Sequence, residues 1–259
     1  MTEPNQNRLE HETSQGALPA GADSEAMAAV GVQQMFDSIA PSYDLLNHLL
    51  SMGLDRWWWA RAARSFRNVL TRPDALVLDL CCGTGDMTMA LARHRPRGVG
   101  EAPVLAVDFS REMLARGKKK FAGRNIIAME ADAMNLPLPS ASLDLITCAY
   151  GFRNLANYTD GLAELYRVLA PGGQIGILEC NQPEGLRGTL YDLYFKRILP
   201  KVGGVISGDS RAYHYLPASV ERFPRPPRML NLIREAGFAE ASWTGYFYGT
   251  AGLYQAVKK

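Results

Sequence analysis

The sequence predicts an α/β fold built on a parallel, nucleotide-binding sheet, and three adjacent features predict it. Residues 77–80 are a short apolar run that carries one carboxylate, Asp79, as expected of a buried parallel strand. Gly83 and Gly85 then allow a sharp turn that leaves no side chain between the backbone and a ligand. Residues 87–93 follow with the composition of a helix. Strand, glycine turn and helix are typical of the first crossover of a nucleotide-binding sheet.

The spacing within this turn separates two classes of ligand. A dinucleotide fingerprint requires a third glycine three positions after the second, where this chain has Thr88. The observed pattern, Asp79-x-x-x-Gly83-x-Gly85, resembles motif I of the class I S-adenosylmethionine (SAM) methyltransferases. That resemblance implies a SAM-binding loop whose cofactor-binding residues are Asp79, Gly83, Thr84 and Gly85.

The next apolar run supports the same class of ligand. Residues 104–107 predict a second strand, and Asp108 stands at its end. A carboxylate there can accept hydrogen bonds from both hydroxyls of a ribose. The alternative is that Asp108 caps the following helix, but Ser110 is better placed for capping. We therefore expect Asp108 to bind the ribose of SAM.

The composition indicates a single globular domain. Of the 259 residues, 47% are hydrophobic and 21% charged, which is ordinary for an α/β protein. No segment reaches the roughly 18 uninterrupted apolar residues of a membrane span. The cysteines lack C-x-x-C spacing and fall in or beside apolar runs, so we expect reduced core thiols of a cytosolic protein and no metal site. They are Cys81, Cys82, Cys148 and Cys180. A redox-active Cys81–Cys82 pair is the alternative.

Residues 1–28 are expected to form a disordered acidic tail. They carry five acidic residues against one base, Arg8, and no aromatic residue, so they cannot bury enough surface to fold. An acidic start that is poor in arginine is untypical of secretory or mitochondrial targeting segments, which favours the cytoplasm. Without the tail, the net charge rises from +2 to +6. That charge is far below the dense basic field of a nucleic-acid-binding protein, so no nucleic acid is expected as a partner.

A helical cap is expected over residues 29–70, before the first strand. Leu54, Trp58, Ala62 and Phe66 recur at every fourth position, as in a helix that packs on the sheet. Within this region, one motif resembles the N-terminal signature of the quinone C-methyltransferases. The motif is Met35-Phe36-Asp37-x-Ile39-Ala40-x-x-Tyr43-Asp44-Leu45-Leu46-Asn47. Members of that family methylate demethylmenaquinol and the polyprenyl benzoquinol precursors of ubiquinone.

Further motifs follow in the family's order, and the resemblance covers about residues 33–259. It implies a class I SAM-methyltransferase fold, a Rossmann-like seven-stranded sheet with helices on both faces and an antiparallel last strand. Asp132 and Ala133 fall where the family reads the adenine, and residues 151–154 match its G-[LIVF]-R-N motif. Two departures are Ala149, where many relatives have Ser, and Cys180-Asn181, where relatives often have Phe-Ser.

Residues 181–228 are expected to form a helical substrate-cap insertion. Its apolar positions recur with helical spacing: Leu186, Leu190, Leu193, Tyr194 and Ile198. Further on, a second motif resembles the sequences of the quinone C-methyltransferases: Tyr213-His214-Tyr215-Leu216-Pro217. The segment is basic as well as amphipathic. It is therefore either a helical lid with an ordinary solvated face or the cap of a prenyl-quinone pocket that touches the membrane surface.

The family resemblance also implies the chemistry. A ring carbon of a reduced prenylated quinone attacks the methyl group of SAM, and the protein stabilises a phenolate. Arg153 and Asn154 are the candidates for that stabilisation, and Tyr43 for a hydrogen bond to a quinol oxygen. His214 titrates in a range suited to a general base, although a lone His is more often structural.

Several alternatives stay open at this stage. Demethylmenaquinol is the favoured substrate, with a ubiquinone-pathway benzoquinol or another small phenolic or lipid substrate as alternatives. A non-catalytic assembly module is disfavoured because the motif residues are intact. Weak peripheral membrane contact is expected through the Trp57-Trp58-Trp59 run and the apolar stripe of the insertion. Formation of a homo-oligomer is left open.

Overall fold

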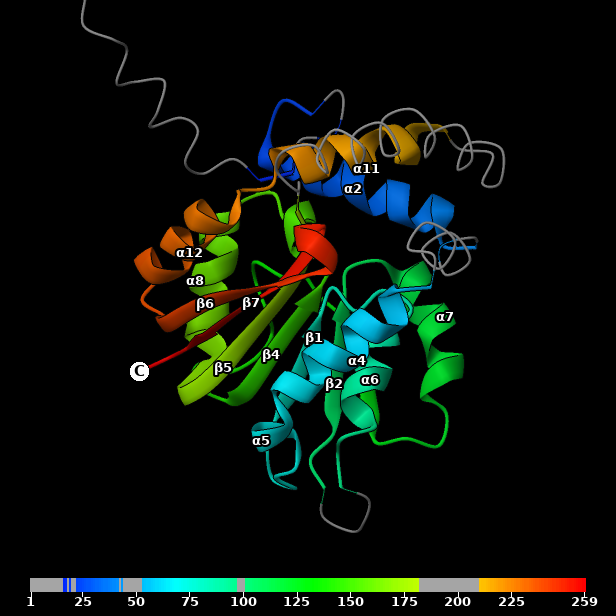
Figure 1. Cartoon of the computed structure of the whole chain (residues 1–259). Coiled ribbons are helices and arrows are strands. Elements are labelled where there is room, and N and C mark those ends of the chain that lie inside the picture. The colour runs from blue at the N-terminus through cyan, green and yellow to red at the C-terminus, as the bar shows by residue number, and fades with distance from the viewer. Residues whose placement is uncertain are drawn as a thin grey trace, which may run out of the picture.

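The structure of the protein is a computed structural model of the whole chain (Figure 1). It describes residues 16–17, 19, 22–41, 43, 53–96, 101–181 and 210–259, with side chains from Tyr215 onward in the last range. Within these ranges, no helix combines the length and the apolar character that crossing a membrane requires.

A seven-stranded sheet forms the centre of the molecule, in the order β3-β2-β1-β4-β5-β7-β6. The strands are β1 (Val77–Leu80), β2 (Val104–Asp108), β3 (Ile126–Glu130), β4 (Leu143–Ala149), β5 (Leu169–Cys180), β6 (Ala239–Tyr246) and β7 (Ala251–Val257). The first five are mutually parallel, whereas β7 runs antiparallel to both β5 and β6. The predicted fold class is therefore confirmed, including the antiparallel last strand.

Helices cover both faces of the sheet and its carboxyl end. α4 (Asp55–Ser65), α6 (Asp86–Ala92) and α7 (Arg111–Phe121) lie on one face, and α8 (Tyr158–Val168) and α12 (Pro226–Glu235) on the other (Figure 1). α2 (Glu25–Ile39) and α11 (Ser210–Arg222) cross the end of the sheet, and α5 (Arg67–Leu70) follows α4. Two short 3-10 helices complete the fold, η1 (Phe152–Asn154) and η3 (Phe247–Gly249).

The predicted apolar stripe of α4 packs on the sheet as expected. Trp58, Ala62 and Phe66 are buried in one core cluster with residues of β1, β4 and β7. The consecutive tryptophans separate, however, because successive helical residues point about 100° apart. Trp58 and Trp59 are buried, whereas Trp57 is 50% exposed. The Trp run is thus mostly core, with one ring left on the surface.

The N-terminal segment is ordered earlier than its composition predicts. α2 begins at Glu25 and is capped by Ser24, whose Oγ accepts a hydrogen bond from the Met27 N–H at 3.3 Å. Ala17 is buried, and its N–H donates to the Leu155 carbonyl at 2.7 Å. The average composition of residues 1–28 conceals this local capping signal. The division of the rest of the chain into tail, domain and cap stays a prediction.

Parts of the predicted cap and tail lie outside the described residues. These parts are residues 1–15, 18, 20–21, 42, 44–52 and 182–209, which include Asp44 to Asn47 of the N-terminal motif and the apolar stripe from Leu186 to Ile198. Of the predicted insertion, the structure describes Asn181 and residues 210–228, which include α11 and the start of α12. The side chain of His214 is also outside the described set.

Candidate active site

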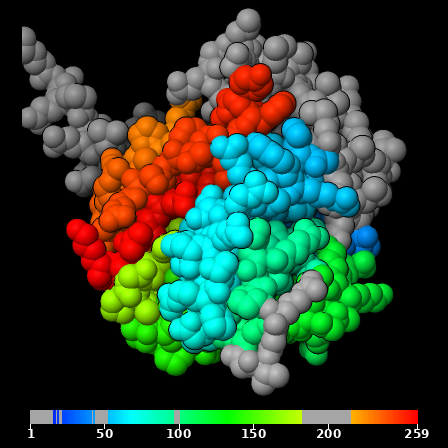
Figure 2. Space-filling model, turned by 60° about the horizontal axis from the view of Figure 1, so that its bottom comes forward, coloured from blue at the N-terminus to red at the C-terminus, as the bar shows by residue number. Residues whose placement is uncertain are grey.

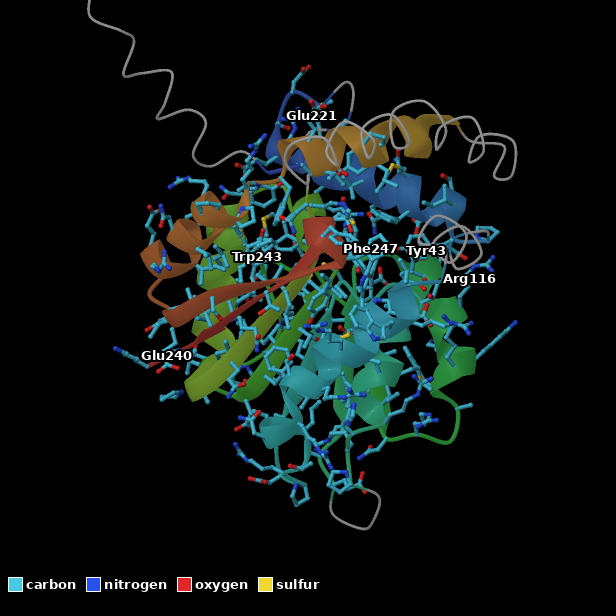
Figure 3. All side chains as sticks on the ribbon, in the orientation of Figure 1. Tyr43, Arg116, Glu221, Glu240, Trp243 and Phe247 are labelled. Atoms are coloured by element: carbon cyan, nitrogen blue, oxygen red, sulfur yellow. The ribbon has the colours of Figure 1, made fainter. Side chains whose placement is uncertain are left out.

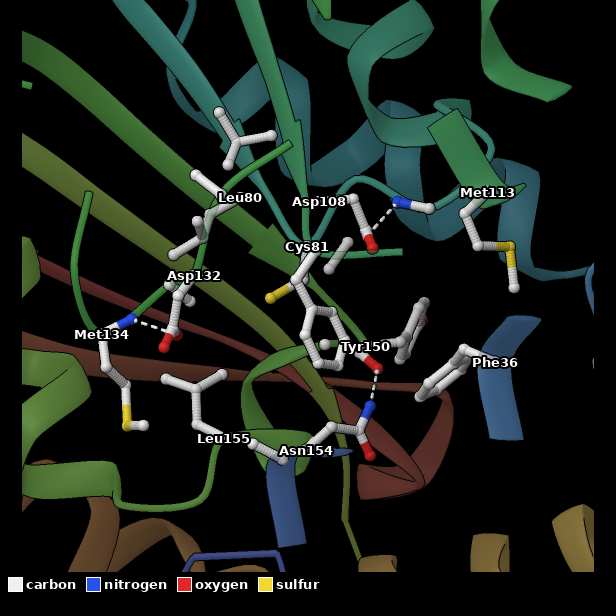
Figure 4. A pocket seen from close by; sticks show the side chains of 18 of the residues that line it. Phe36, Leu80, Cys81, Asp108, Met113, Asp132, Met134, Tyr150, Asn154 and Leu155 are labelled. Atoms are coloured by element: carbon white, nitrogen blue, oxygen red, sulfur yellow. Dashed lines mark hydrogen bonds between the residues drawn. The ribbon is translucent and has the colours of Figure 1, made fainter. Parts of the chain in front are cut away.

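A pocket opens at the carboxyl end of the parallel strands, where ligands of open α/β sheets bind (Figure 4). Its walls come from the ends of β1, β2 and β4, from residues 131–134, from η1 and the loop after it, and from α2 above. The empty space between these walls is about 740 Å³, a figure that includes space open to solvent.

The turn after β1 forms the floor of this pocket. Cys81 and Gly83 line it, both with left-handed backbone at φ 52° and 54°. A Cβ placed on Gly83 would lie 3.7 Å from the Tyr43 ring, so a side chain there would narrow the space between the turn and Tyr43. Cys81 was not predicted to line the pocket, although its position inside the motif was the signal available.

Asp79 lies behind the turn and does not line the pocket. Its carboxylate is fully buried and accepts hydrogen bonds from Thr88 Oγ1 at 2.6 Å and Thr147 Oγ1 at 3.0 Å. Burial raises the pKa of Asp79 to about 7, although the two hydroxyl groups oppose the shift. Asp79 thus fastens β1 to α6 and β4 and supports the turn. A direct contact of Asp79 with the cofactor stays a prediction.

Thr84 and Gly85 also support the turn from outside the pocket. Thr84 is buried, and its Oγ1 accepts a hydrogen bond from Lys120 Nζ at 3.0 Å. Gly85 precedes α6 with φ 87°, and the Phe121 ring occupies the space that a Cβ would need. Their role as cofactor-binding residues likewise stays a prediction.

Asp108 lines the pocket and is held by backbone donors (Figure 4). One carboxylate oxygen accepts the Gly83 N–H at 2.7 Å, and the other accepts the Ser110 N–H at 2.8 Å. Each oxygen has a second lone pair, so both can still accept a ribose hydroxyl. Burial raises the pKa of Asp108 to about 6 in spite of the backbone hydrogen bonds. As expected, Ser110 caps the next helix, with its Oγ accepting the Met113 N–H at 3.2 Å.

Asp132 and Ala133 also line the pocket, and Figure 4 shows Asp132 on the side of Cys81 away from Asp108. Asp132 Oδ1 accepts the Met134 N–H at 2.9 Å, which orients the carboxylate in the loop after β3. This location suits the predicted contact with the adenine amino group. Within the described ranges, no three His, Cys, Asp or Glu side chains cluster in a way that could hold a metal ion.

Arg153 forms a buried ion pair with Glu179 at the end of β5. Arg153 Nη1 lies 2.8 Å from one Glu179 carboxylate oxygen, and the Arg153 backbone N–H donates to the other at 3.0 Å. Burial opposes the charge of Arg153, but the carboxylate outweighs burial and raises the guanidinium pKa. Arg153 does not line the pocket, whereas the adjacent Asn154 does. Sequence reasoning missed Glu179 as a partner, although a carboxylate ending an apolar strand was visible.

Asn154 and Tyr43 both line the pocket. Asn154 Oδ1 accepts a hydrogen bond from the Tyr215 hydroxyl at 3.1 Å, which ties α11 to η1. The Tyr43 ring packs edge-on against Phe36 of α2, with ring centroids 6.0 Å apart. Tyr215 was not singled out in the sequence, although it belongs to the motif that contains His214.

The sheet order, the glycine turn after β1 and the carboxylate at the end of β2 define a class I SAM-dependent methyltransferase. Solved structures agree with the fold. A SAM-dependent methyltransferase of Thermotoga maritima superposes with a TM-score of 0.61 at 17% identity, covering 88% of this chain and 100% of that one. One from Aquifex aeolicus gives 0.52 at 17% identity, covering 77% and 98%.

Sequence comparisons identify the family. The chain belongs to the ubiE/COQ5 methyltransferase family, whose model matches residues 23–258. It is 40% identical to a demethylmenaquinone methyltransferase of Deinococcus radiodurans over 95% of this chain and 100% of the relative. It is 45% identical to one of Thermus thermophilus, over 79% and 91%. A ubiquinone/menaquinone biosynthesis C-methyltransferase UbiE of Geobacter sulfurreducens is 39% identical, over 88% of each chain. The resemblance expected from the motifs is confirmed, and with it SAM as the cofactor.

Proposed function

We propose that the protein methylates a ring carbon of a reduced polyprenyl quinone precursor, with demethylmenaquinol as its substrate and menaquinol as its product. The observation that carries the proposal is the convergence of two family motifs on one pocket. Tyr43 and Asn154 come from those motifs and line the same pocket as Gly83 and Asp108. Relatives named for demethylmenaquinone support the naphthoquinol. The UbiE name covers both quinones, so benzoquinol methylation is the second candidate.

The cofactor would lie across the turn after β1. Asp108 would accept the ribose hydroxyls, and Asp132 with the backbone of Ala133 would pair with the adenine. SAM supplies an electrophilic methyl group when bound. The task of this chain is to hold the nucleophilic ring carbon in line with that methyl and to exclude water. Alignment of this kind is worth about 7–11 kcal/mol of the barrier.

The substrate side of the pocket would be set by Tyr43 and Asn154. Both can hydrogen-bond a quinol oxygen. Arg153, which is paired with Glu179 behind the pocket, would hold η1 in place so that Asn154 can donate to a ring oxygen. That hydrogen bond would favour the phenolate form of the ring, which makes the ring carbon a stronger nucleophile. A preorganised contribution of this kind is on the order of 3 kcal/mol. His214 stays our proposed general base.

The direct test is product mass. Purified protein would be incubated with SAM and, separately, reduced demethylmenaquinone and reduced demethylated benzoquinone, each with a short prenyl chain. We expect one added methyl group on the naphthoquinol. Methylation of the benzoquinol alone would select the second candidate. SAM binding with no methylation of either quinol would favour another small phenolic or lipid substrate, and no SAM binding would favour a non-catalytic module.

We propose that this reaction takes place at the inner face of the cell membrane, where a cytoplasmic protein meets a substrate whose prenyl tail lies in the bilayer. Attachment would be peripheral and weak, because each basic residue near an anionic surface contributes only about 1 kcal/mol. Nucleic acid is not a proposed partner, because the charge is only mildly basic. A homo-oligomer stays open.

A further inference from the structure

Three large aromatic side chains are exposed on two elements that lie next to each other. Trp57 of α4 is 50% exposed, and Phe247 and Tyr248 of η3, the loop between β6 and β7, are 48% and 69% exposed. Figure 2 shows this red loop beside the light-blue start of α4. Contiguous exposed aromatic rings mark an interaction site more often than scattered apolar residues do.

An arginine fixes the rings of this cluster. The Arg61 guanidinium lies 5.1 Å from the centroid of the Trp57 ring and 4.8 Å from that of Tyr246. Trp57 and Tyr246 also meet edge to face, with centroids 6.0 Å apart. Cation–π contacts of this geometry are attractive and restrict the rings. The exposed face of Trp57 is therefore held in place before any partner arrives.

The loop presents its aromatic rings at the expense of backbone strain. Phe247 and Tyr248 have φ of 40° and 59°, followed by Gly249 at 86°. Bulky residues with positive φ are rare, and strained residues of this kind concentrate at functional sites. Fold stability alone would favour Gly or Asn at these positions. The strain indicates that aromatic side chains at this loop serve binding.

The surface around the rings is basic. Arg56, Arg61 and Arg64 are exposed along α4, and Arg67 is exposed at the start of α5. Asp55, the acidic residue of α4, is buried. In the part of the chain that the structure describes, no carboxylate forms an ion pair with these four arginines. The cluster therefore complements an anionic partner.

The cluster lies at the same end of the sheet as the active site. Cys180 at the end of β5 pairs with Ala251, and the Asn181 N–H donates to the Thr250 carbonyl at 2.9 Å, so the β6–β7 loop projects from the carboxyl edge. Figure 3 places Phe247 and Tyr43 at the end of the sheet nearest α2. On α4, Trp58 packs against Tyr150, which lines the pocket, with ring centroids 6.3 Å apart.

We propose that Trp57, Phe247 and Tyr248, with Arg56, Arg61 and Arg64, form a docking face for an anionic lipid bilayer beside the pocket. We call this set the aromatic–arginine face. Tryptophan and tyrosine favour the bilayer interface, and arginine favours anionic headgroups. The inference rests on the proposed function only for the identity of the prenylated substrate that the bilayer would supply. A peptide groove is disfavoured because the rings project from the surface.

Vesicle sedimentation tests the face. The full-length protein would be mixed with phosphatidylcholine vesicles with and without phosphatidylglycerol. We expect binding to the anionic vesicles at low salt and release as salt rises. Arg56→Gln with Arg64→Gln should weaken binding by about fivefold to 25-fold, since each charge contributes about fivefold. The matched control is Lys118→Gln with Arg124→Gln, which removes two exposed charges that do not belong to the aromatic–arginine face and should leave binding unchanged.

The aromatic side chains have their own control. Trp57→Ala and Phe247→Ala should each weaken vesicle binding, whereas Ile127→Ala, which removes a 52% exposed side chain from β3, should not. Equal loss in all variants, or no vesicle binding by the parent protein, would overturn the proposal. The proposal would also be overturned if light scattering showed that the parent protein is a dimer and that Phe247→Ala dissociates it. A second copy of the chain would then occupy the face.

Activity separates this inference from the proposed function. The Trp57 and Phe247 variants should methylate a short-chain quinol in solution as the parent does and lose rate with a long-chain quinol in vesicles. If the protein binds vesicles through the aromatic–arginine face but methylates no quinol, the docking proposal stands and the proposed function is wrong. If the protein methylates the short-chain quinol and the variants do not lower the rate with the long-chain quinol in vesicles, the proposed function stands and the docking proposal is wrong.

Discussion

The carboxylate of Glu179 accepts hydrogen bonds from both the backbone N–H and the guanidinium of Arg153. The Glu179 side chain therefore holds both the backbone and the side chain of Arg153 in place. Glu179 is the penultimate residue of β5, and Arg153 is the middle residue of η1. The loop that presents Asn154 to the pocket is therefore anchored on the neighbouring strand. Because both charges are buried, removing either one would leave the other buried without a counter-ion.

Glu179→Gln should lower the free energy of unfolding by about 3 kcal/mol, because it leaves the Arg153 charge buried without a counter-ion. Urea denaturation measures the loss. The control is Glu235→Gln, which removes one partner of the exposed Arg228–Glu235 pair and should cost less than about 1 kcal/mol. Equal costs for the two variants would contradict the importance of the buried pair.

Arg153→Lys should lower turnover by about 10²-fold and leave SAM affinity nearly unchanged. A lysine keeps the charge, but its compact ammonium cannot hold the position of the guanidinium. Arg153→Ala is less informative, since it also leaves Glu179 unpaired. Steady-state kinetics and calorimetric SAM titration measure the two effects. A parallel loss of SAM affinity would assign Arg153 to the cofactor or to folding.

Asp108→Asn should weaken SAM binding by at least about tenfold, since hydrogen bonds to a charged acceptor are worth about 1.5–3 kcal/mol. The pKa of Asp108 is about 6, and the ionised form is the better acceptor. SAM affinity of the parent protein should therefore fall as the pH drops through about 6. Affinity of the variant should not follow this profile. Calorimetry at several pH values would show both effects, and identical profiles would remove Asp108 from the ribose site.

Asp79→Asn should remove one source of pH-dependent stability. The folded-state pKa of about 7 exceeds the ordinary value of 3.8, so the folded protein binds more protons than the unfolded chain between these values. Asp79 therefore destabilises the fold progressively as the pH rises from about 4 to 7, by at most about 1.4 kcal/mol per pH unit. Denaturation of both proteins across this window gives the difference. Parallel stability curves would contradict the raised pKa.

Gly85→Ala should destabilise the fold more than Gly123→Ala. Both glycines have positive φ, 87° and 73°, so both substitutions carry a backbone cost of about 1–2 kcal/mol. Only at Gly85 would the new Cβ meet the Phe121 ring, at 2.2 Å, whereas nothing lies within 4 Å at Gly123. Overpacking adds about 1–3 kcal/mol. Thermal unfolding compares the two, and equal losses would mean that Phe121 moves aside freely.

Local patterns in the sequence were sufficient to predict the strand–turn–helix unit and the Ser110 cap. Each depends on residues close in the chain, where turn chemistry and periodicity act directly. The anchoring contacts were not predictable in the same way. Thr147 reaches Asp79 and Glu179 reaches Arg153 across separate strands, so these pairs follow from sheet order and register. The family resemblance supplied the site residues that local patterns could not.

The position of β7 has a consequence for the order of folding. β7 is the last strand of the chain, yet it lies inside the sheet, between β5 and β6. β6 emerges first during synthesis but has no strand to pair with until β7 follows it. The backbone of β6 therefore stays unpaired until β7 is made, and β6 joins the sheet only through β7. A ribosome-bound chain halted before residue 251 would hold a five-stranded parallel sheet whose β5 edge is open to pairing with another chain.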